Sequence, residues 1–137
     1  MTLIDFIKEN DVDYSYNRVE ESFICEMEKK LGTTVGVQLK KYILDYGYLG
    51  YKYVELFGVN NHLGLNSNMI KKTKMLNERF NKTKKLIAIE NQGDGDYYLV
   101  DEKDFVYRFI EDTDEIIPQN INLFEYILKR FLVAQGG

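Results

Sequence analysis

Two aspartates in the second half of the chain have the spacing of a partial cation site. Asp94 and Asp96 flank Gly95, and hard cations such as Ca²⁺ prefer clustered carboxylates. A calcium-binding loop needs a third oxygen ligand two residues after Asp96, and Tyr98 occupies that place. Asp and Gly also tolerate the positive φ of tight turns. We therefore interpret the stretch as a hairpin turn.

A metal-dependent hydrolase built on Asp94, Asp96 and Asp101 is an alternative for the same region. In such enzymes two carboxylates hold Mg²⁺ and a lysine orients the attacking water, and Lys103 stands two residues after Asp101. The carboxylates would have to lie on adjacent strands and face one way. Lys103 falls in a predicted turn, and the negative net charge repels nucleic acid. We assign no metal ligand here.

Nucleophilic catalysis has little support in the sequence. The chain holds one cysteine, Cys25, one histidine, His62, and three serines, none of them in a Gly-x-Ser-x-Gly setting. Cys25 and His62 alone cannot supply the usual ligand number of a zinc site. Cys25 lies next to the apolar face of a predicted helix, where a free cysteine usually packs as a small apolar residue. We expect no catalytic residue and no cofactor.

The densest run of charge predicts a contact with another protein. Glu111, Asp112, Asp114 and Glu115 form an acidic segment that is predicted to be a loop. Such a segment is usually a solvated surface. It could also attract a basic partner, accelerate association and favour the correct partner. These four residues are the first predicted contact surface.

A cluster of tyrosines predicts a second contact surface. Residues 49–57 are rich in Tyr, Val and Leu and are typical of a strand. Alternate side chains of a strand share a face, so we expect Tyr51 and Tyr53 to lie together, with Glu55 beyond them. If that face is open, the tyrosines offer the large amphipathic contacts that dominate binding interfaces. At least half of the neighbouring tyrosines are expected to pack in the core.

The composition restricts the class of protein. The chain has 137 residues, 45% of them hydrophobic and 29% charged, with a net charge of −4. This suits one globular domain over residues 1–137. No stretch approaches the ~18 apolar residues of a membrane-spanning helix. The charge favours a basic protein partner over nucleic acid. A single cysteine and the absence of a secretory signal predict a cytoplasmic protein.

The hydrophobic periodicity predicts an α+β fold. Apolar residues three or four positions apart predict helices at residues 2–10, 18–31, 37–46, 69–80 and 123–133. Short β-rich runs predict strands at residues 49–57, 86–90, 97–101 and 105–110. We expect a helical hairpin packed on a mostly antiparallel meander, with one helix between strands and one at the C-terminus. Pro118 is taken to exclude a strand after residue 115.

Several strings, in their order along the chain, resemble the SUKH superfamily, the Smi/Knr-type domain. They are Ile24-x-x-Met27-Glu28-x-x-Leu31-Gly32, Leu39-x-x-Tyr42-x-x-x-Tyr46-Gly47, Glu55-Leu56-Phe57-Gly58, and Gly93-x-Gly95-Asp96-x-Tyr98-x-Val100-Asp101. The resemblance extends over residues 19–132. Val35-Gly36 departs from the Leu-Pro of the family, and tryptophan is absent.

The resemblance implies that the protein acts by binding. Bacterial members are similar to immunity proteins, which neutralise a co-encoded polymorphic toxin, a nuclease or deaminase delivered by contact-dependent or secreted systems. Fungal relatives look like regulatory hubs of cell-wall synthesis and signalling. The acidic composition suits the immunity type, and a regulatory interaction module is the alternative. The resemblance implies no catalytic residue. We also expect no membrane or nucleic-acid partner, and a monomer or weak dimer.

Overall fold

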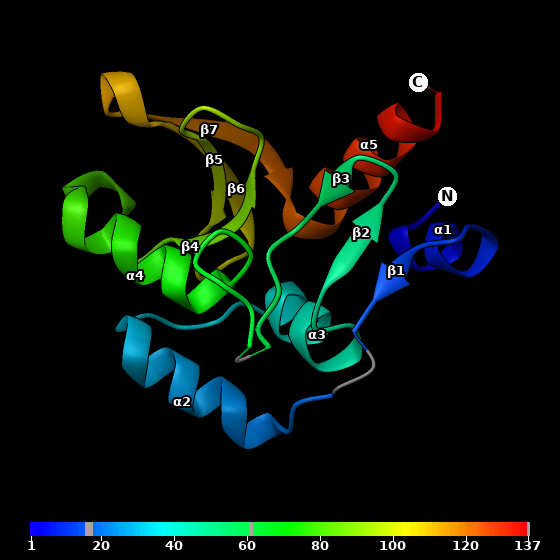
Figure 1. Ribbon diagram of the computed structural model, residues 1–137, viewed down its shortest axis with the longest axis horizontal. Helices are drawn as coiled ribbons and strands as arrows, with labels where there is room; N and C mark the ends of the chain where they lie inside the picture. Colours follow the sequence, from blue (N-terminus) through cyan, green and yellow to red (C-terminus); the bar gives the residue numbers. More distant parts are fainter. Residues whose placement is uncertain (16–17, 61, 137) are drawn as a thin grey trace.

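The computed structural model describes residues 1–15, 18–60 and 62–136 and shows an α+β fold, as the periodicity predicts. The elements are α1 (Leu3–Glu9), β1 (Asp13–Tyr14), α2 (Glu21–Leu31), α3 (Val37–Asp45), β2 (Leu49–Tyr51), β3 (Val54–Glu55), α4 (Met69–Arg79), η1 (Asn81–Thr83), β4 (Ile87–Asn91), β5 (Asp96–Val100), β6 (Phe105–Ile110), η2 (Glu111–Thr113), β7 (Glu115–Asn122) and α5 (Leu123–Gly136). The strands form two antiparallel sheets, β1-β2-β3 and β4-β5-β6-β7. Figure 1 shows α4 beside the larger sheet and α1 and α5 beside the smaller one.

The helices lie close to their predicted positions because their caps and apolar spacing agree. Thr2 and Asp5 form a reciprocal capping box at the start of α1. Gly32 ends α2 in the left-handed conformation, with φ of 66°. Asn122 caps α5 by accepting a hydrogen bond from the Glu125 amide. The second predicted helix is shorter than expected, and residues 16–17 of the connection before it lie outside the described residues.

The predicted single strand over residues 49–57 is instead two short strands joined by a tight turn. Lys52 has a φ of 53°, and this left-handed residue reverses the chain between β2 and β3. Tyr51 therefore pairs with Val54 across the turn. Tyr51 is buried against Phe6 and Phe131, with ring centroids 5.1 and 5.6 Å away. The prediction that Tyr51 and Tyr53 share one face of a strand is wrong, because Tyr51 is buried and Tyr53, beyond the turn, is exposed.

The exclusion of a strand around Pro118 is also wrong. The eight-residue strand β7 contains this proline. It lies at the edge of the larger sheet, and its register against β6 shifts between Phe105 and Tyr107. A proline is compatible with an edge strand or bulge because a ladder bond need not be donated there. The acidic run before it begins in the 3₁₀ turn η2, and its last residue, Glu115, starts β7.

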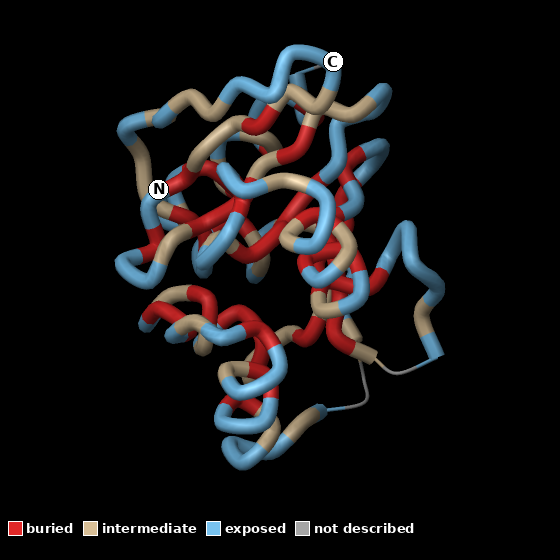
Figure 2. Tube along the Cα trace, turned by 90° about the vertical axis from the view of Figure 1, so that its left-hand side faces the viewer, coloured by how far each residue is buried: buried red, intermediate tan, exposed pale blue. Residues whose placement is uncertain are grey.

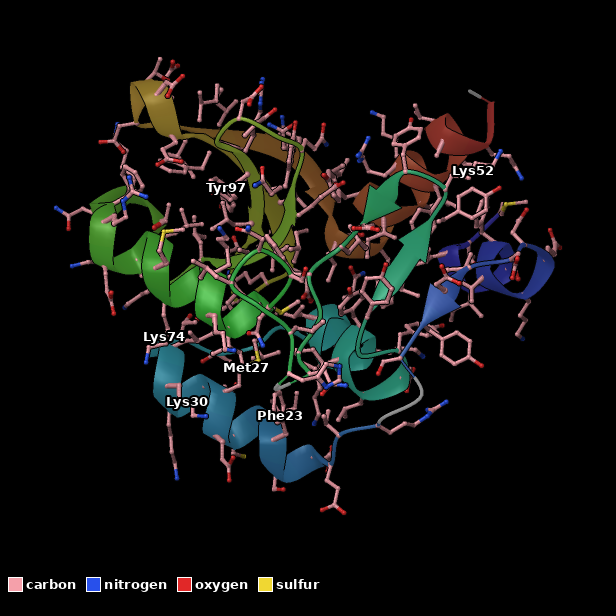
Figure 3. All side chains as sticks on the ribbon, viewed as in Figure 1. Phe23, Met27, Lys30, Lys52, Lys74 and Tyr97 are labelled. Carbon is pink, nitrogen blue, oxygen red and sulfur yellow. The ribbon has the colours of Figure 1, made fainter. Side chains whose placement is uncertain are left out.

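The core lies where the helices meet the two sheets. Figure 2 shows the buried segments gathered inside the molecule and the exposed ones around it. Phe6, Ile43 and Phe131 are among the fully buried side chains that join the smaller sheet to α1, α3 and α5. Met27 points from α2 toward α4 in Figure 3 and joins the same cluster. Cys25 is exposed, contrary to the core role expected for it.

A remote carboxylate caps the start of α3. Gly36 precedes this helix and has no side chain to cap it. Asp104, from the turn between β5 and β6, instead accepts hydrogen bonds from the amides of Gln38 (2.8 Å) and Leu39 (3.0 Å). A Cβ atom on Gly36 would lie 2.4 Å from Oδ1 of Asp104. Glycine at this position lets the buried carboxylate approach, and the contact ties α3 to the larger sheet.

Replacing Asp104 with alanine should lower the free energy of unfolding by about 2 kcal/mol, because two charge-assisted hydrogen bonds are lost. Gly36→Ala should have a similar cost, since the new Cβ displaces the same carboxylate. The double variant should then be little worse than either single variant. Urea denaturation of the three variants measures this coupling. Strictly additive losses would show that the two residues act independently.

Candidate functional site

A polar pocket of about 430 Å³ opens between β3 and β4. It lies where the smaller sheet meets the larger one, and α5 supplies one wall. Its lining is formed by Tyr53, Glu55, Leu56, Phe57, Asn66, Ser67, Glu90, Asn91, Gln92 and Arg130. We call it the β3–β4 pocket. It brings together residues from both sheets, the loop before α4, and α5.

A buried ion pair forms part of the pocket. Glu90 of β4 is 3% exposed, and Arg130 of α5 is 20% exposed. The guanidinium donates from Nε to Oε1 of Glu90 (3.0 Å) and from Nη2 to Oε2 (2.7 Å). Tyr126 also donates its hydroxyl hydrogen to Oε1 and accepts a hydrogen bond from Gln92 (3.0 Å). The four side chains hold α5 against β4.

The environment of these groups changes their proton affinities. Burial, followed by the charge of Glu90, raises the pKa of the Tyr126 hydroxyl. Hydrogen bonding to Glu90 raises the pKa of Arg130. A buried ion pair stabilises a fold less than apolar packing of similar size often does. A charged network at a pocket is therefore a reasonable candidate for a functional site.

A second buried tyrosine positions the strand that borders the pocket. Tyr42 of α3 donates a hydrogen bond to the carbonyl oxygen of Phe57 (2.7 Å) and accepts one from the Leu49 amide (3.2 Å). It therefore holds both ends of the β2–β3 hairpin. Burial raises the pKa of this hydroxyl. Tyr42 and Tyr126 are both expected to remain neutral in the folded protein at high pH.

The stability of the protein should fall with pH above about 10. Unfolded tyrosine ionises near pH 10, whereas Tyr42 and Tyr126 keep their protons in the folded state. Below about pH 10, the two tyrosines make their full contribution to the free energy of unfolding. Above it, the free energy of unfolding should fall by about 1.4 kcal/mol per pH unit for each group. Urea denaturation between pH 8 and pH 11 measures the slope. Tyr42→Phe should reduce it, and an unchanged slope would contradict the assignment.

The structure separates the residues of the second predicted contact surface. Tyr53 and Glu55 line the β3–β4 pocket, and Tyr53 is 63% exposed. The guanidinium of Arg130 lies 5.9 Å from the centroid of the Tyr53 ring. Tyr51 is buried and does not line the pocket. Two of the three residues thus belong to one concave surface.

The first predicted contact surface is only partly free of internal contacts. Glu111 is half-buried and forms an ion pair with Arg79 (2.9 Å). Asp112, Asp114 and Glu115 are exposed. Lys82 lies beside them and donates a hydrogen bond to the carbonyl oxygen of Asp114 (2.7 Å). In Figure 1 this segment, the gold coil between β6 and β7, lies far from β3.

Two of the three aspartates considered for metal binding, Asp96 and Asp101, have structural contacts. Asp96 pairs with Arg108 across β5 and β6, at 2.8 and 3.2 Å. Asp101 accepts hydrogen bonds from the amides of Lys103 and Phe105 and from the hydroxyl of Tyr107. Asp96 begins β5, and Asp101 follows its last residue. Among the described residues, no group of three His, Cys, Asp or Glu side chains could hold a metal ion.

One lysine of α4 is buried. Lys72 is 4% exposed, and burial lowers the pKa of its ammonium group. It donates a hydrogen bond to Asn66 (3.3 Å) and lies 5.5 Å from the ring centroid of Tyr97. Lys30 and Lys74, labelled with Tyr97 in Figure 3, project from α2 and α4. Lys72 thus supports the loop that carries Asn66 and Ser67 into the pocket.

Sequence analysis missed the ionic part of the pocket. Glu90 follows the apolar run Ile87-Ala88-Ile89, and Arg130 is four residues after Tyr126. A charge at the end of a buried strand is a signal for a buried partner. The positions of Tyr126 and Arg130 also place them on one face of a helix. Nothing in the sequence alone pairs residues 90 and 130.

Comparison with known proteins identifies the family. The family model SUKH_5, described as SMI1-KNR4 cell-wall, matches residues 2–132. A search of curated proteins found no match. None of the described helices has the length and apolar character required to cross a membrane. Because the match covers nearly the whole chain and the α+β fold agrees with it, the chain belongs to the SMI1-KNR4 cell-wall family of SUKH-type domains.

Proposed function

We propose that the protein is a non-enzymatic immunity protein that binds and neutralises a co-encoded polymorphic toxin in the cytoplasm. Family membership over residues 2–132 is the observation that carries the proposal. The net charge of −4 supports a basic partner. A nuclease or deaminase toxin fits, because enzymes that act on nucleic acid need basic surfaces.

Inhibition would result from covering the toxin's active site. Exposed carboxylates at Asp112, Asp114 and Glu115 would accelerate the encounter. The exposed ring of Tyr53 would contribute to the stability of the complex, since aromatic side chains often dominate binding energy. No chemical step by this chain is required. A 1:1 complex is therefore the expected inhibitory species.

The test is a titration of the purified protein into the toxin domain encoded beside its gene. Isothermal titration calorimetry should give 1:1 binding with a dissociation constant below about 1 µM. The activity of the toxin should fall in proportion to the complex formed. Bacteria that express the toxin should grow only when this protein is also expressed. Unimpaired toxin activity in the presence of excess protein would contradict the proposal.

A regulatory interaction module linked to cell-wall synthesis is the second candidate, since the family description itself contains the words cell-wall. Deletion of the gene distinguishes the two functions. A cell-wall defect without any toxin present would favour the regulatory module. Death that requires the neighbouring toxin gene would favour the immunity protein.

A further inference from the structure

The β3–β4 pocket is an opening between two strand edges. β3 is the last strand of the smaller sheet, and β4 is the first strand of the larger one. The amide of Phe57, just after β3, donates a hydrogen bond to the carbonyl oxygen of Ile89 (2.8 Å). No β3–β4 ladder is present in the described part of the chain. The two edges touch at this point and then diverge around the pocket.

The main chain of β3 faces the opening at Glu55. The Leu56 amide donates to the carbonyl oxygen of Leu49, which makes these two residues a hydrogen-bonded pair of the β2–β3 ladder. Glu55 is opposite Gly50 in the register. Pairs alternate between bonded and non-bonded along an antiparallel ladder. The N–H and C=O of Glu55 therefore point away from β2, toward β4.

The main chain of β4 faces the opening at Asn91 for the same reason. The Gln92 amide donates to the carbonyl oxygen of Asp96, so this pair belongs to the bonded set of the β4–β5 ladder. Asn91 is opposite Tyr97 in the next, non-bonded pair. The N–H and C=O of Asn91 therefore point away from β5. Both edges present main-chain groups to the β3–β4 pocket.

The rest of the lining is also polar. Leu56 and Phe57 line the pocket although their side chains are buried, so the surface they present is mainly main chain. Arg130 uses Nε and Nη2 to bind Glu90, and the contacts described for it leave Nη1 available to an acceptor. Asn66, Ser67 and Asn91 add side-chain amide and hydroxyl groups. An occupant with many hydrogen-bonding groups fits this lining.

We propose that the β3–β4 pocket receives an extended segment of a protein partner, which adds as a strand between the edges of β3 and β4. Its main chain pairs with the N–H and C=O groups of Glu55 and Asn91. The side chains of the partner segment that face Arg130 are polar. Exposed strand edges are known docking positions for extended peptides, with main-chain hydrogen bonds giving affinity and the lining giving specificity.

Charge argues for a different protein rather than a second copy as the occupant. The Glu90 charge is balanced by Arg130, which leaves the carboxylate of Glu55 as the net charge of the lining. A second copy would bring another chain with net charge −4. A basic partner is attracted to the same surface. The inference rests on the proposed function to the extent that this partner is the toxin.

The test uses the full chain and two tryptophan variants. Ser67 is exposed and lines the pocket, so Ser67→Trp should fill the opening. Ser22 is exposed on α2, so Ser22→Trp is the matched control. The first probe is a display library of random 12-residue peptides selected on the wild-type protein. The second probe is the toxin domain encoded beside the gene.

For the selected peptides, Ser67→Trp should raise the dissociation constant at least about tenfold, or about 1.4 kcal/mol, and Ser22→Trp should leave it unchanged. Amide hydrogen exchange of Glu55 and Asn91, followed by NMR, should slow at least about tenfold on binding. Selected peptides that bind both variants equally and leave these two amides unprotected would overturn the proposal. Recovery of no peptide from the library would also count against it.

The toxin probe distinguishes this inference from the proposed function. A 1:1 toxin complex that protects Glu55 and Asn91 supports both. A toxin complex that leaves these amides unprotected and tolerates Ser67→Trp supports the immunity function and contradicts strand addition. Peptide binding at the pocket without any toxin complex supports strand addition and contradicts the immunity function. A second copy as occupant would appear as a dimer lost in Ser67→Trp, and would contradict the assignment to a different protein.

Discussion

Replacing Glu90 with alanine should destabilise the protein by about 3–5 kcal/mol. The substitution leaves the guanidinium of Arg130 in a mostly buried position without its carboxylate partner, and breaking a buried pair from one side has a cost of this size. The Tyr126 hydroxyl loses its acceptor at the same time. Thermal unfolding should show a melting temperature lower by roughly 10 °C or more.

Asp96→Ala is the matched control for this change. Asp96 and Arg108 also form a bidentate pair between neighbouring elements, but their side chains are 25% and 39% exposed. Solvent screens such a pair, so its loss should cost no more than about 1 kcal/mol. Equal losses for Glu90→Ala and Asp96→Ala would show that burial does not set the energy of the pocket network.

A double variant tests why the protein contains the pair. Glu90→Met together with Arg130→Met removes both charges and fills similar volume with apolar side chains. Buried ion pairs can often be replaced in this way with little loss of stability. We expect the double variant to be more stable than Glu90→Ala. A variant that folds well but no longer binds the peptides selected on the wild type would place the role of the pair in binding rather than in stability.

Local patterns were sufficient to predict the helices and most of the larger sheet. The spacing of apolar residues is a property of neighbouring positions, and the structure confirms the helices that it predicts, with the first one capped at Thr2 and the second one ended by Gly32. The hairpin at Gly93–Gly95 also follows from residue type. Both glycines and Asp94 have positive φ, as an Asp-Gly turn predicts.

The errors arise where the surroundings override local preference. Lys52 adopts a left-handed conformation that lysine rarely favours, so a single strand was predicted where the chain reverses. Pro118 is compatible with β7 because that strand lies at an edge. An edge is a property of the assembled sheet. No residue pattern within 49–57 or 115–122 reveals these facts.

The candidate site was predicted only in part for the same reason. The residue types of Tyr53 and Glu55 make them candidates for a contact surface before their positions are known, and both line the pocket. Glu90 and Arg130 are forty residues apart, and only the packing of α5 on the sheets brings them together. The two strand edges of the β3–β4 pocket likewise come from different sheets. Long-range packing defines the pocket, and a single sequence does not record it.

Charge changes in the acidic segment at residues 112–115 should slow binding of the toxin without shortening the lifetime of the complex. We expect Asp112→Lys, Asp114→Asn and Glu115→Lys together to lower the association rate constant roughly 10–100-fold at low salt. Asparagine at position 114 preserves the left-handed conformation of that residue, whose φ is 53°. The effect should shrink at 0.15 M salt, where the Debye length is about 8 Å. Stopped-flow measurements at two salt concentrations test both statements.

A matched control separates local attraction from net charge. Glu9, Asp11 and Glu26 are exposed on the N-terminal part of the chain, and Glu9→Lys, Asp11→Asn and Glu26→Lys make the same total charge change. Equal slowing by both triple variants would mean that the electrostatic field of the whole molecule, rather than the acidic segment, attracts the toxin. The N-terminal variant should therefore retain most of the association rate if the acidic segment is the docking position.

The β3–β4 pocket should show the opposite kinetic behaviour. Tyr53→Ala removes an exposed aromatic contact and should raise the dissociation rate constant about 30-fold, the equivalent of a hot spot worth about 2 kcal/mol. Its association rate should hardly change, because the substitution alters no charge. The gold coil that carries the acidic segment and strand β3 lie far apart in Figure 1, so one partner that is sensitive to both surfaces must cover the molecule from that coil to β3. The roles assigned to the two surfaces would be reversed if the charge changes at residues 112–115 altered the dissociation rate and Tyr53→Ala altered the association rate.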